Sequence, residues 1–395
     1  MKKLSCILIV VLSISLFVGC TGKAEKENQI VIWANYSEEE ESKLQELCDK
    51  WGSENNKNVK LVASSVNEVE YNAVKEAKYD SPDIIWGIST EKTGWLKENN
   101  CVEELPSDID VVENYISNDI VENASIDGVR YGVPIYVETL GLFYNKDLVS
   151  EVPGTIEELL EVSKEKGLSF NIANGYFSYG FISACGGYVF KNNNGSFDKN
   201  DIGLDNEGAI KGYKLLSDIC NKYKLGIEDN TDDCAEACFS MGKSAFYIGE
   251  QKKVKNFIKG KINFGITTIP SINGESFKPF KEVKMAFVNP NSAEKEESYE
   301  LLKYLIENSG DSLINANKIP AIKSYVESET FKSNNYLQGF YKQLETSEVT
   351  PNIYELQAYW GTMDRNLQLL ILGDSTPEEC GKNVKKDMEE LMKDF

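Results

Sequence analysis

The 395-residue sequence contains no histidine. This absence excludes catalysis by Ser-His-Asp or Cys-His groups and every zinc site of the HExxH type. Phosphate-binding signatures are missing as well, since the sequence has neither a P-loop of the form GxxxxGKS/T nor a GxGxxG turn after a strand. We therefore expect no cofactor, no metal ion and no ATP hydrolysis by a P-loop route.

Positive charge is scarce. Lysine and arginine together number 42 against 63 acidic residues, which gives a net charge of −21. This balance opposes binding to nucleic acid or to an anionic membrane surface. The hydrophobic share of 41% and the charged share of 27% are ordinary for a soluble globular protein, and the length is sufficient for two or three domains.

Cysteine occurs in an uneven set that does not indicate a disulfide scaffold. Seven cysteines lie beyond Cys20, so they cannot all pair internally: Cys48, Cys101, Cys185, Cys220, Cys234, Cys238 and Cys380. Two of them lie one helical turn apart at positions 234 and 238, but no second pair follows. Buried and mostly reduced thiols are expected.

A long apolar run is found at the N-terminus, after Lys2 and Lys3. Residues 6–18 are too few to span a bilayer comfortably and are typical of a secretory signal. The run ends in "LFVGC", which resembles a bacterial lipobox with Cys20 as the lipidated residue. Residues 1–19 are thus predicted to be a lipoprotein signal peptide and residues 20–29 a tether that anchors the chain to the outer face of the cell membrane. An ordinary signal peptide with an incidental cysteine is the alternative.

Strand-like and helix-like segments alternate in the first part of the mature chain. "QIVIWANY", "VKLVASS" and "SPDIIWGIS" are β-rich. Between the first two, the apolar residues of "SEEEESKLQELCDKWG" recur with helical spacing, with Ser37 as the expected N-cap and Gly52 as the expected end. Alternation of this kind predicts an α/β fold with a parallel sheet covered by helices.

The later part of the chain repeats these signals. Thr155 with Glu158 indicates a capping box for a helix that ends at Gly167, and a longer helix is expected within residues 205–226. "SAFYIG" and "INFGITTIP" are expected strands. Thr376, followed by Pro377, predicts the start of the last helix.

Glu138 is a carboxylate inside the apolar run "PIYVETLGLFYNKDL". Burial of an unpaired carboxylate is costly. Glu138 is therefore either a satisfied structural group or a residue that faces a wet cleft.

Aromatic residues cluster in two segments, "NGYFSYGF" and "TPNIYELQAYWGTMDR". Aromatic faces pack well on sugar rings, and neighbouring polar groups can bind the hydroxyls. We expect Phe181 and Tyr359 in the core, and we expect Tyr176 and Trp360 in contact with a ligand.

Taken together and in order, six groups of residues resemble the extracellular solute-binding proteins of ABC importers, of the maltose/maltodextrin-binding type. They include "VIWAN", "SPDIIWG", "VRYGVPIYVETLGLFYNKDL", the long segment from "FNIANGYFSYGF" to "GLDNEGA", "FGITTIPSINGESFKPF" and "TPNIYELQAYWG". The resemblance implies a two-lobed, periplasmic-binding-protein-like α/β fold with the ligand in the cleft between the lobes. It implies a first lobe of residues 30–136 with 287–316, a second lobe of residues 141–281 with 322–395, and hinge crossings at 137–140, 282–286 and 317–321.

The resemblance also implies which residues bind the solute. Glu138 would hydrogen-bond sugar hydroxyls at the hinge, Tyr176 would contact the sugar, and Trp360 would stack on it, with Phe177 as a neighbouring aromatic. Other family positions are occupied by different residues in this sequence, and we take these as further ligand-binding candidates: Glu38, Trp86, Glu91, Asn174, Glu250, Lys252 and Asp364.

The resulting prediction is a lipid-anchored, monomeric receptor that delivers an oligosaccharide to a membrane permease driven by a separate ATPase. A variant is that Glu38, Glu91 and Asp364 make the cleft acidic and select an amino sugar or another cationic solute. A sensory lipoprotein on the same scaffold is a further alternative. A glycosidase that uses Glu138 with Glu250 is the enzymatic alternative, although the resemblance implies binding without turnover.

Overall fold

The computed structural model describes residues 28–34, 38–63, 81–107, 109, 114–226 and 231–395. The predicted signal peptide, Cys20, most of the tether and the Ser37 cap lie outside these residues. None of the described helices has both the length and the apolar composition needed to cross a bilayer.

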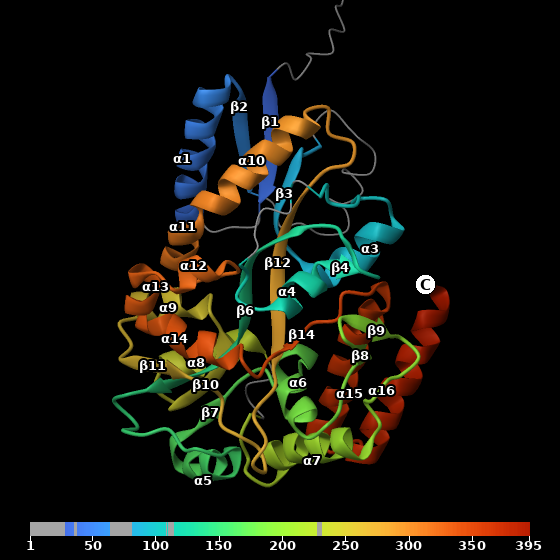
Figure 1. The fold of residues 1–395 in the computed structure, drawn as a ribbon. Helices are drawn as coiled ribbons and strands as arrows, with labels where there is room; N and C mark the ends of the chain where they lie inside the picture. The colour runs from blue at the N-terminus through green and yellow to red at the C-terminus, as the bar shows by residue number, and fades with distance from the viewer. Residues whose placement is uncertain (1–27, 35–37, 64–80, 108, 110–113, 227–230) are drawn as a thin grey trace, which may run out of the picture.

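The first half of the molecule is built on a parallel sheet, as predicted. Strands β1 (Gln29–Ala34), β2 (Asn58–Ala63) and β3 (Ile84–Ser89) run parallel in the order β2-β1-β3. Helices α1 (Glu38–Asn55) and α10 (Lys295–Asn308) pack together against this sheet in the upper part of Figure 1. Their shared apolar core includes Ile30, Ile32, Trp51 and Leu302.

Helix α1 does not end at Gly52, as the sequence analysis expected, but continues to Asn55. Gly52 is buried, and a Cβ atom at this position would lie 2.5 Å from the carbonyl oxygen of Lys57. The glycine is therefore needed for close approach of the chain that leaves the helix. The reversal itself occurs at Asn56, whose φ is +55°.

Two long strands join the halves. Strand β6 (Val133–Asn145) and strand β12 (Phe280–Val288) are antiparallel neighbours in the centre of a ten-stranded mixed sheet, and they run from the upper to the lower half in Figure 1. The register pairs Glu282 with Glu138 and Lys284 with Tyr136, and it shifts directly after Lys284. Strand β13 (Ile319–Pro320) adds a third segment at this junction, since it pairs with β6 at Tyr136 and Val137.

The second half continues the same sheet and covers it with helices. Strands β10 (Phe246–Glu250) and β11 (Phe264–Thr267) are antiparallel to β6, and β7 (Leu168–Ser169) lies parallel to β10. On one side, Phe143 packs against five aromatic rings at centroid distances of 5.2–6.3 Å. On the other side lie the packed helices α6 (Gly175–Ala184), α7 (Glu207–Asn221), α15 (Tyr359–Leu372) and α16 (Pro377–Leu391).

The predicted caps of two helices are confirmed. Thr155 caps α5 (Ile156–Lys166) by accepting a hydrogen bond from the backbone of Glu158, and Gly167 follows the last turn with φ +77°. Thr376 caps α16 with a complete capping box that Glu379 closes.

Shorter elements complete the fold. The remaining strands are β4 (Ser125–Ile126), β5 (Val129–Arg130), β8 (Lys191–Asn193), β9 (Ser196–Asp198) and β14 (Glu348–Val349). The remaining helices are η1 (Thr90–Lys92), α3 (Thr93–Glu98), α4 (Asn118–Asn123), α8 (Asp232–Ser240), α9 (Lys253–Lys259), α11 (Gly310–Asn315), α12 (Lys323–Val326), α13 (Glu329–Ser333), α14 (Asn335–Gln343), η2 (Tyr354–Ala358) and η3 (Met392–Asp394).

The cysteines follow the expectation of burial only in part. Four of the seven thiols are buried, and burial raises the pKa to about 12 at three of them, Cys48, Cys220 and Cys380. Cys234 is exposed, contrary to the prediction, because α8 turns Ala235 and Phe239 toward the core instead.

Candidate functional site

Three side chains in line on one face of β12 form the centre of the candidate site. Residues alternate between the two faces of a strand, so Phe280, Glu282 and Lys284 share a face, which we call the front face. Lys284 forms an ion pair with Glu282, and its Nζ lies 3.7 Å from the Glu138 carboxylate on β6. Glu138 is therefore half-buried and paired with a lysine.

The charges of this group reinforce one another. Burial alone would lower the pKa of Lys284, but the carboxylates of Glu282 and Glu138 outweigh burial and raise that pKa. Burial likewise works to raise the pKa of Glu282, but Lys284 and a hydrogen bond from Ser89 hold it below its usual value. Glu282 and Lys284 are thus both charged near neutral pH.

Glu250 reaches the same place from the end of β10. Its carboxylate lies 2.6 Å from Nζ of Lys252, whose side chain is 62% exposed. Burial raises the pKa of Glu250, and the nearby charges of Glu138 and Glu282 add to this effect. Glu138 and Lys252 also line a pocket of about 370 Å³ between α9 and the segment before β13.

Glu91 reaches the group from the first half of the molecule, on η1 directly after β3. Its nearest cation is Lys92, at 3.5 Å, and Lys92 also donates a hydrogen bond of 3.2 Å to Gln357 in the second half. Burial raises the pKa of Glu91, and the charge of Glu282 contributes. Carboxylates from both halves therefore meet at the strands that join them.

An aromatic group lies beside these charges. The ring of Phe280 is 5.8 Å from that of Trp360 and 6.2 Å from that of Tyr176, measured between centroids. Both Trp360 and Tyr176 are half-buried. Tyr359 and Phe181 are fully buried, which confirms the prediction that these two belong to the core.

The hydroxyl of Tyr176 is the unusual feature of this group. Its oxygen is buried and has no hydrogen-bond partner among the described residues. Burial raises its pKa well above the usual value, and the next contributions come from Glu282, Glu250, Glu138 and Glu91, in that order. Because the Tyr176 ring lies 6.2 Å from that of Phe280, which shares the front face with Glu282, this polar atom without a partner lies beside the charged groups of that face.

Several predicted site residues also have structural contacts. Asn174 caps α6 by accepting hydrogen bonds from the backbone amides of Tyr176 and Phe177. Its side-chain amide donates to Asp364, which also accepts a hydrogen bond from the backbone amide of Gly175. Phe177 and Trp86 are packed in the cores of the second and first half, respectively. These contacts position Tyr176 at the start of α6. Phe177 and Trp86 are buried, whereas Asn174 and Asp364 are partly exposed. The side chain of Glu38 lies outside the described part of the structure.

The sequence analysis did not select Glu282 and Lys284 as ligand candidates, although it placed them in a hinge crossing. A signal was present, because charged and apolar residues alternate in "FKEVKMAFV". The alternation alone does not show that Glu282 lies opposite Glu138, because this neighbourhood depends on the register of β12 against β6.

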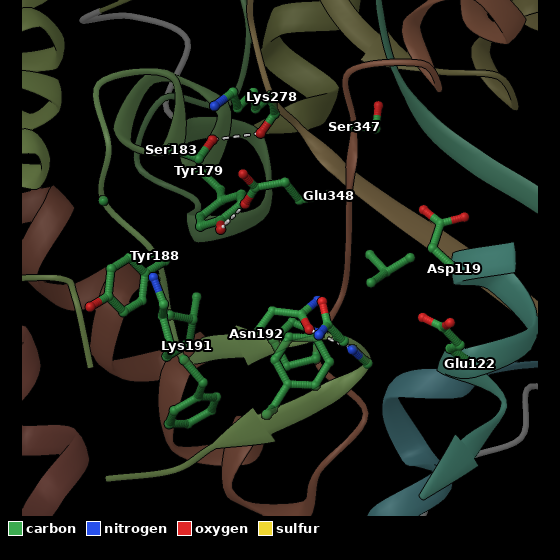
Figure 2. Close-up of a pocket in the computed structure, with 18 of the residues that line it drawn as sticks. Asp119, Glu122, Tyr179, Ser183, Tyr188, Lys191, Asn192, Lys278, Ser347 and Glu348 are labelled. Carbon is green, nitrogen blue, oxygen red and sulfur yellow. Dashed lines mark hydrogen bonds between the residues drawn. The ribbon is translucent and has the colours of Figure 1, made fainter. Parts of the chain in front are cut away.

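Lys281 lies on the opposite face of β12, which we call the back face, and forms an ion pair with Asp119. Asp119 lines a second cavity beside β14, which we call the back-face cavity, and Tyr179, which also lines it, stacks on the ring of Phe280 with centroids 3.7 Å apart. The cavity has a volume of about 560 Å³, and none of the predicted ligand residues line it. Figure 2 shows Asp119 and Glu122 on one side and Tyr179 with Glu348 on the other. Lys281 of β12 lies 2.6 Å from Asp119, and the Tyr179 hydroxyl donates to Glu348 over 2.7 Å.

Comparison with known proteins agrees with this architecture. Residues 35–311 match the family described as bacterial extracellular solute-binding protein. The chain is 28% identical over 407 residues to the galactooligosaccharide-binding protein of Bacillus subtilis (strain 168), with 96% of this chain and 95% of that protein covered. It is 27% identical to the maltodextrin-binding protein MdxE of the same organism, with 85% and 84% covered.

Solved structures show the same fold. The maltose-maltodextrin binding protein of Alicyclobacillus acidocaldarius superposes with a TM-score of 0.84 at 29% identity, covering 91% of this chain and all of that one. The predicted two-lobed α/β fold is thereby confirmed. The chain belongs to the bacterial extracellular solute-binding proteins.

Proposed function

We propose that this protein captures an oligosaccharide between its two halves and delivers it to the permease of an ABC importer. The observation that carries the proposal is the pairing of half-buried aromatic rings with a ring of charged groups at the joining strands. Trp360 and Tyr176 offer apolar faces to sugar rings, and Glu138 offers oxygen atoms to their hydroxyls. The relatives are named as galactooligosaccharide-binding and maltodextrin-binding proteins, which supports a sugar as the solute.

Capture would occur by closure of the halves about the joining strands. We assign residues 30–136 with 287–316 to the first lobe and residues 141–281 with 322–395 to the second. The crossings are 137–140, 282–286 and 317–321, and the pairing of β12 and β13 with β6 supports this assignment. A ligand that contacts both lobes shifts an open–closed equilibrium toward the closed state.

The protein would act outside the cell as a monomer without enzymatic activity of its own, with transport driven by a separate ATPase. Relatives in Streptococcus pneumoniae are named as solute-binding lipoproteins, which supports lipid anchoring through Cys20. Labelling cells with an alkyne fatty acid would show a tagged protein that is lost in Cys20→Ser. A tag retained in that variant would contradict the anchor.

Glycoside hydrolysis by Glu138 and Glu250 is less well supported. Each of these carboxylates already has a lysine partner, Lys284 and Lys252 respectively. A glycosidase needs one carboxyl group free to donate a proton and another free to act as base or nucleophile. Incubation with the bound oligosaccharide should therefore release no reducing ends.

Thermal unfolding of the purified protein against a panel of oligosaccharides tests the proposal. A ligand that binds only the native state raises the unfolding midpoint. We expect a rise with one class of glycan, lost in Trp360→Ala and retained in the control Phe395→Ala, which truncates an exposed terminal aromatic. No shift with any glycan would contradict sugar binding.

A further inference from the structure

We propose that the sugar taken at this site carries a positive charge, as in an oligosaccharide that contains an amino sugar with a free, protonated amine. This inference rests on the proposed function, because it names the chemical class of the same solute. It depends on how charge is distributed over the elements that meet at the front face.

Four carboxylates converge on the front face from four separate elements. They are Glu91 of η1, Glu138 of β6, Glu250 of β10 and Glu282 of β12. Their side chains are between 16% and 19% exposed, so water compensates each of them only in part. Bringing the halves together thus concentrates like charges at low exposure, which is unfavourable unless cations offset them.

The ion pairs among the described residues offset this charge incompletely. Lys284 serves both Glu138 and Glu282, whereas Lys252 pairs with Glu250 and Lys92 with Glu91. Three ammonium groups are therefore shared by four carboxylates. Lys252 is the most exposed of the three lysines, and solvent therefore screens its charge more than it screens the charge of its partner Glu250.

The orphan hydroxyl of Tyr176 indicates where the missing cation would sit. A protonated amine donates three hydrogen bonds and accepts none. The Tyr176 oxygen can accept one of them, and the carboxylates around it can accept the others. Burial raises the pKa values of Glu91 and Glu250 although each already has a lysine partner, and a further cation beside them would act to lower these pKa values.

Neutral and anionic sugars fit this arrangement less well. A neutral hydroxyl could satisfy Tyr176 but would leave the excess negative charge buried. An acidic sugar would suit the lysines of the pocket beside Glu138, which include Lys255, Lys259 and Lys318. However, Tyr176 does not line that pocket, and Nζ of Lys318 lies 4.1 Å from the centre of the Tyr136 ring. We therefore place the charged amine at Tyr176.

Calorimetric titration of the purified protein with matched sugars tests the charge of the ligand. The probes are glucosamine, galactosamine and the glucosamine trimer, each compared with its N-acetylated form, with the neutral hexose and with the corresponding uronic acid. We expect the free amine to bind at least about ten-fold more tightly at pH 7, the factor typical of a charge-assisted hydrogen bond. Equal or tighter binding of a neutral or acidic sugar would overturn the inference while leaving the proposed function intact. Absence of binding by every glycan would overturn both.

Charge-neutral variants test the site. Glu91→Gln and Glu250→Gln each remove one charge at nearly constant shape, and either should reduce the ratio of amine to neutral-sugar affinity about ten-fold. Glu122→Gln, in the back-face cavity, is the matched control and should keep the full preference. An undiminished preference in both front-face variants, with native circular dichroism spectra, would overturn the assignment.

Discussion

The two faces of β12 carry similar groups in different proportions. On the back face, one lysine, Lys281, meets one carboxylate, Asp119; burial works to raise the pKa of Asp119, but Lys281 outweighs it and lowers that pKa. On the front face, Lys284 is shared by Glu138 and Glu282, and burial raises the pKa values of the neighbouring Glu91 and Glu250. The comparison teaches that one lysine compensates one carboxylate in the Lys281–Asp119 pair, whereas the front-face carboxylates outnumber the lysines that pair with them. We take this excess as the place where a ligand completes the set.

The largest difference between the faces should appear on removal of each lysine. Lys284→Met leaves two half-buried carboxylates without their cation and should lower the free energy of unfolding by about 3–5 kcal/mol. Lys281→Met should cost less, about 1–2 kcal/mol, because the Asp119 side chain is 39% exposed and can regain water. Urea unfolding at pH 7 measures both. Equal losses would break the distinction between the faces.

Aromatic and phenolic substitutions should separate the faces by ligand affinity. Trp360→Ala should weaken binding of the sugar by about 2 kcal/mol, roughly thirty-fold, as expected for a central aromatic contact. Tyr179→Phe removes the hydrogen bond to Glu348 but keeps the ring that stacks on Phe280, and it should leave affinity unchanged. Calorimetric titration with the same sugar distinguishes them, and a comparable loss in Tyr179→Phe would extend the site into the cavity beside β14.

The pH dependence of stability should have opposite signs on the two faces. Because the folded-state pKa values of Glu91 and Glu250 lie above the usual 4.5, stability falls as pH rises from about that value through the folded-state values. Because the folded-state pKa of Asp119 lies below the usual 3.8, its contribution is present above that value and is lost as pH falls through the folded-state pKa.

Unfolding curves across pH measure these contributions in paired variants. Glu91→Gln should reduce the fall in stability as pH rises above about 4.5, and Asp119→Asn should reduce the fall in stability as pH drops below about 3.8. An unchanged fall above pH 4.5 in Glu91→Gln would mean that the front-face carboxylates are fully compensated in the folded protein.

The smallest effect concerns the boundary of the front-face site. Asp364→Ala removes the acceptor at the start of α6 and should cost about 1 kcal/mol of stability. Affinity should change little, because the Asp364 oxygens are engaged with Asn174 and Gly175. A loss of affinity as large as that of Trp360→Ala would show that Asp364 contacts the ligand, as the sequence predicted.

Features that depend on local pattern were predictable from the sequence. The caps at Thr155 and Thr376 and the strands of the first sheet follow from neighbouring residues. The end of α1 was predicted wrongly, because Gly52 is present for close packing against the backbone of Lys57 and does not end the helix.

The candidate site was predictable only in part. Glu138 was conspicuous as a carboxylate in an apolar run, and the aromatic segments indicated Tyr176 and Trp360. Its lysine partner was not predictable, because strand register brings together β6 and β12 from distant parts of the chain. The exposure of Cys234 depends in the same way on which face of α8 meets the core.

The long-range pairing of β12 also governs when the protein can fold. Ser89 of β3 pairs with Lys284, so the first sheet lacks its central neighbour until almost 200 further residues have been made. At ribosomal rates this wait lasts roughly 10 to 40 seconds, and pairings so distant in sequence form slowly even afterwards. A polypeptide that stays open for so long can still be threaded through a translocation channel, which is what a protein that works outside the cell requires.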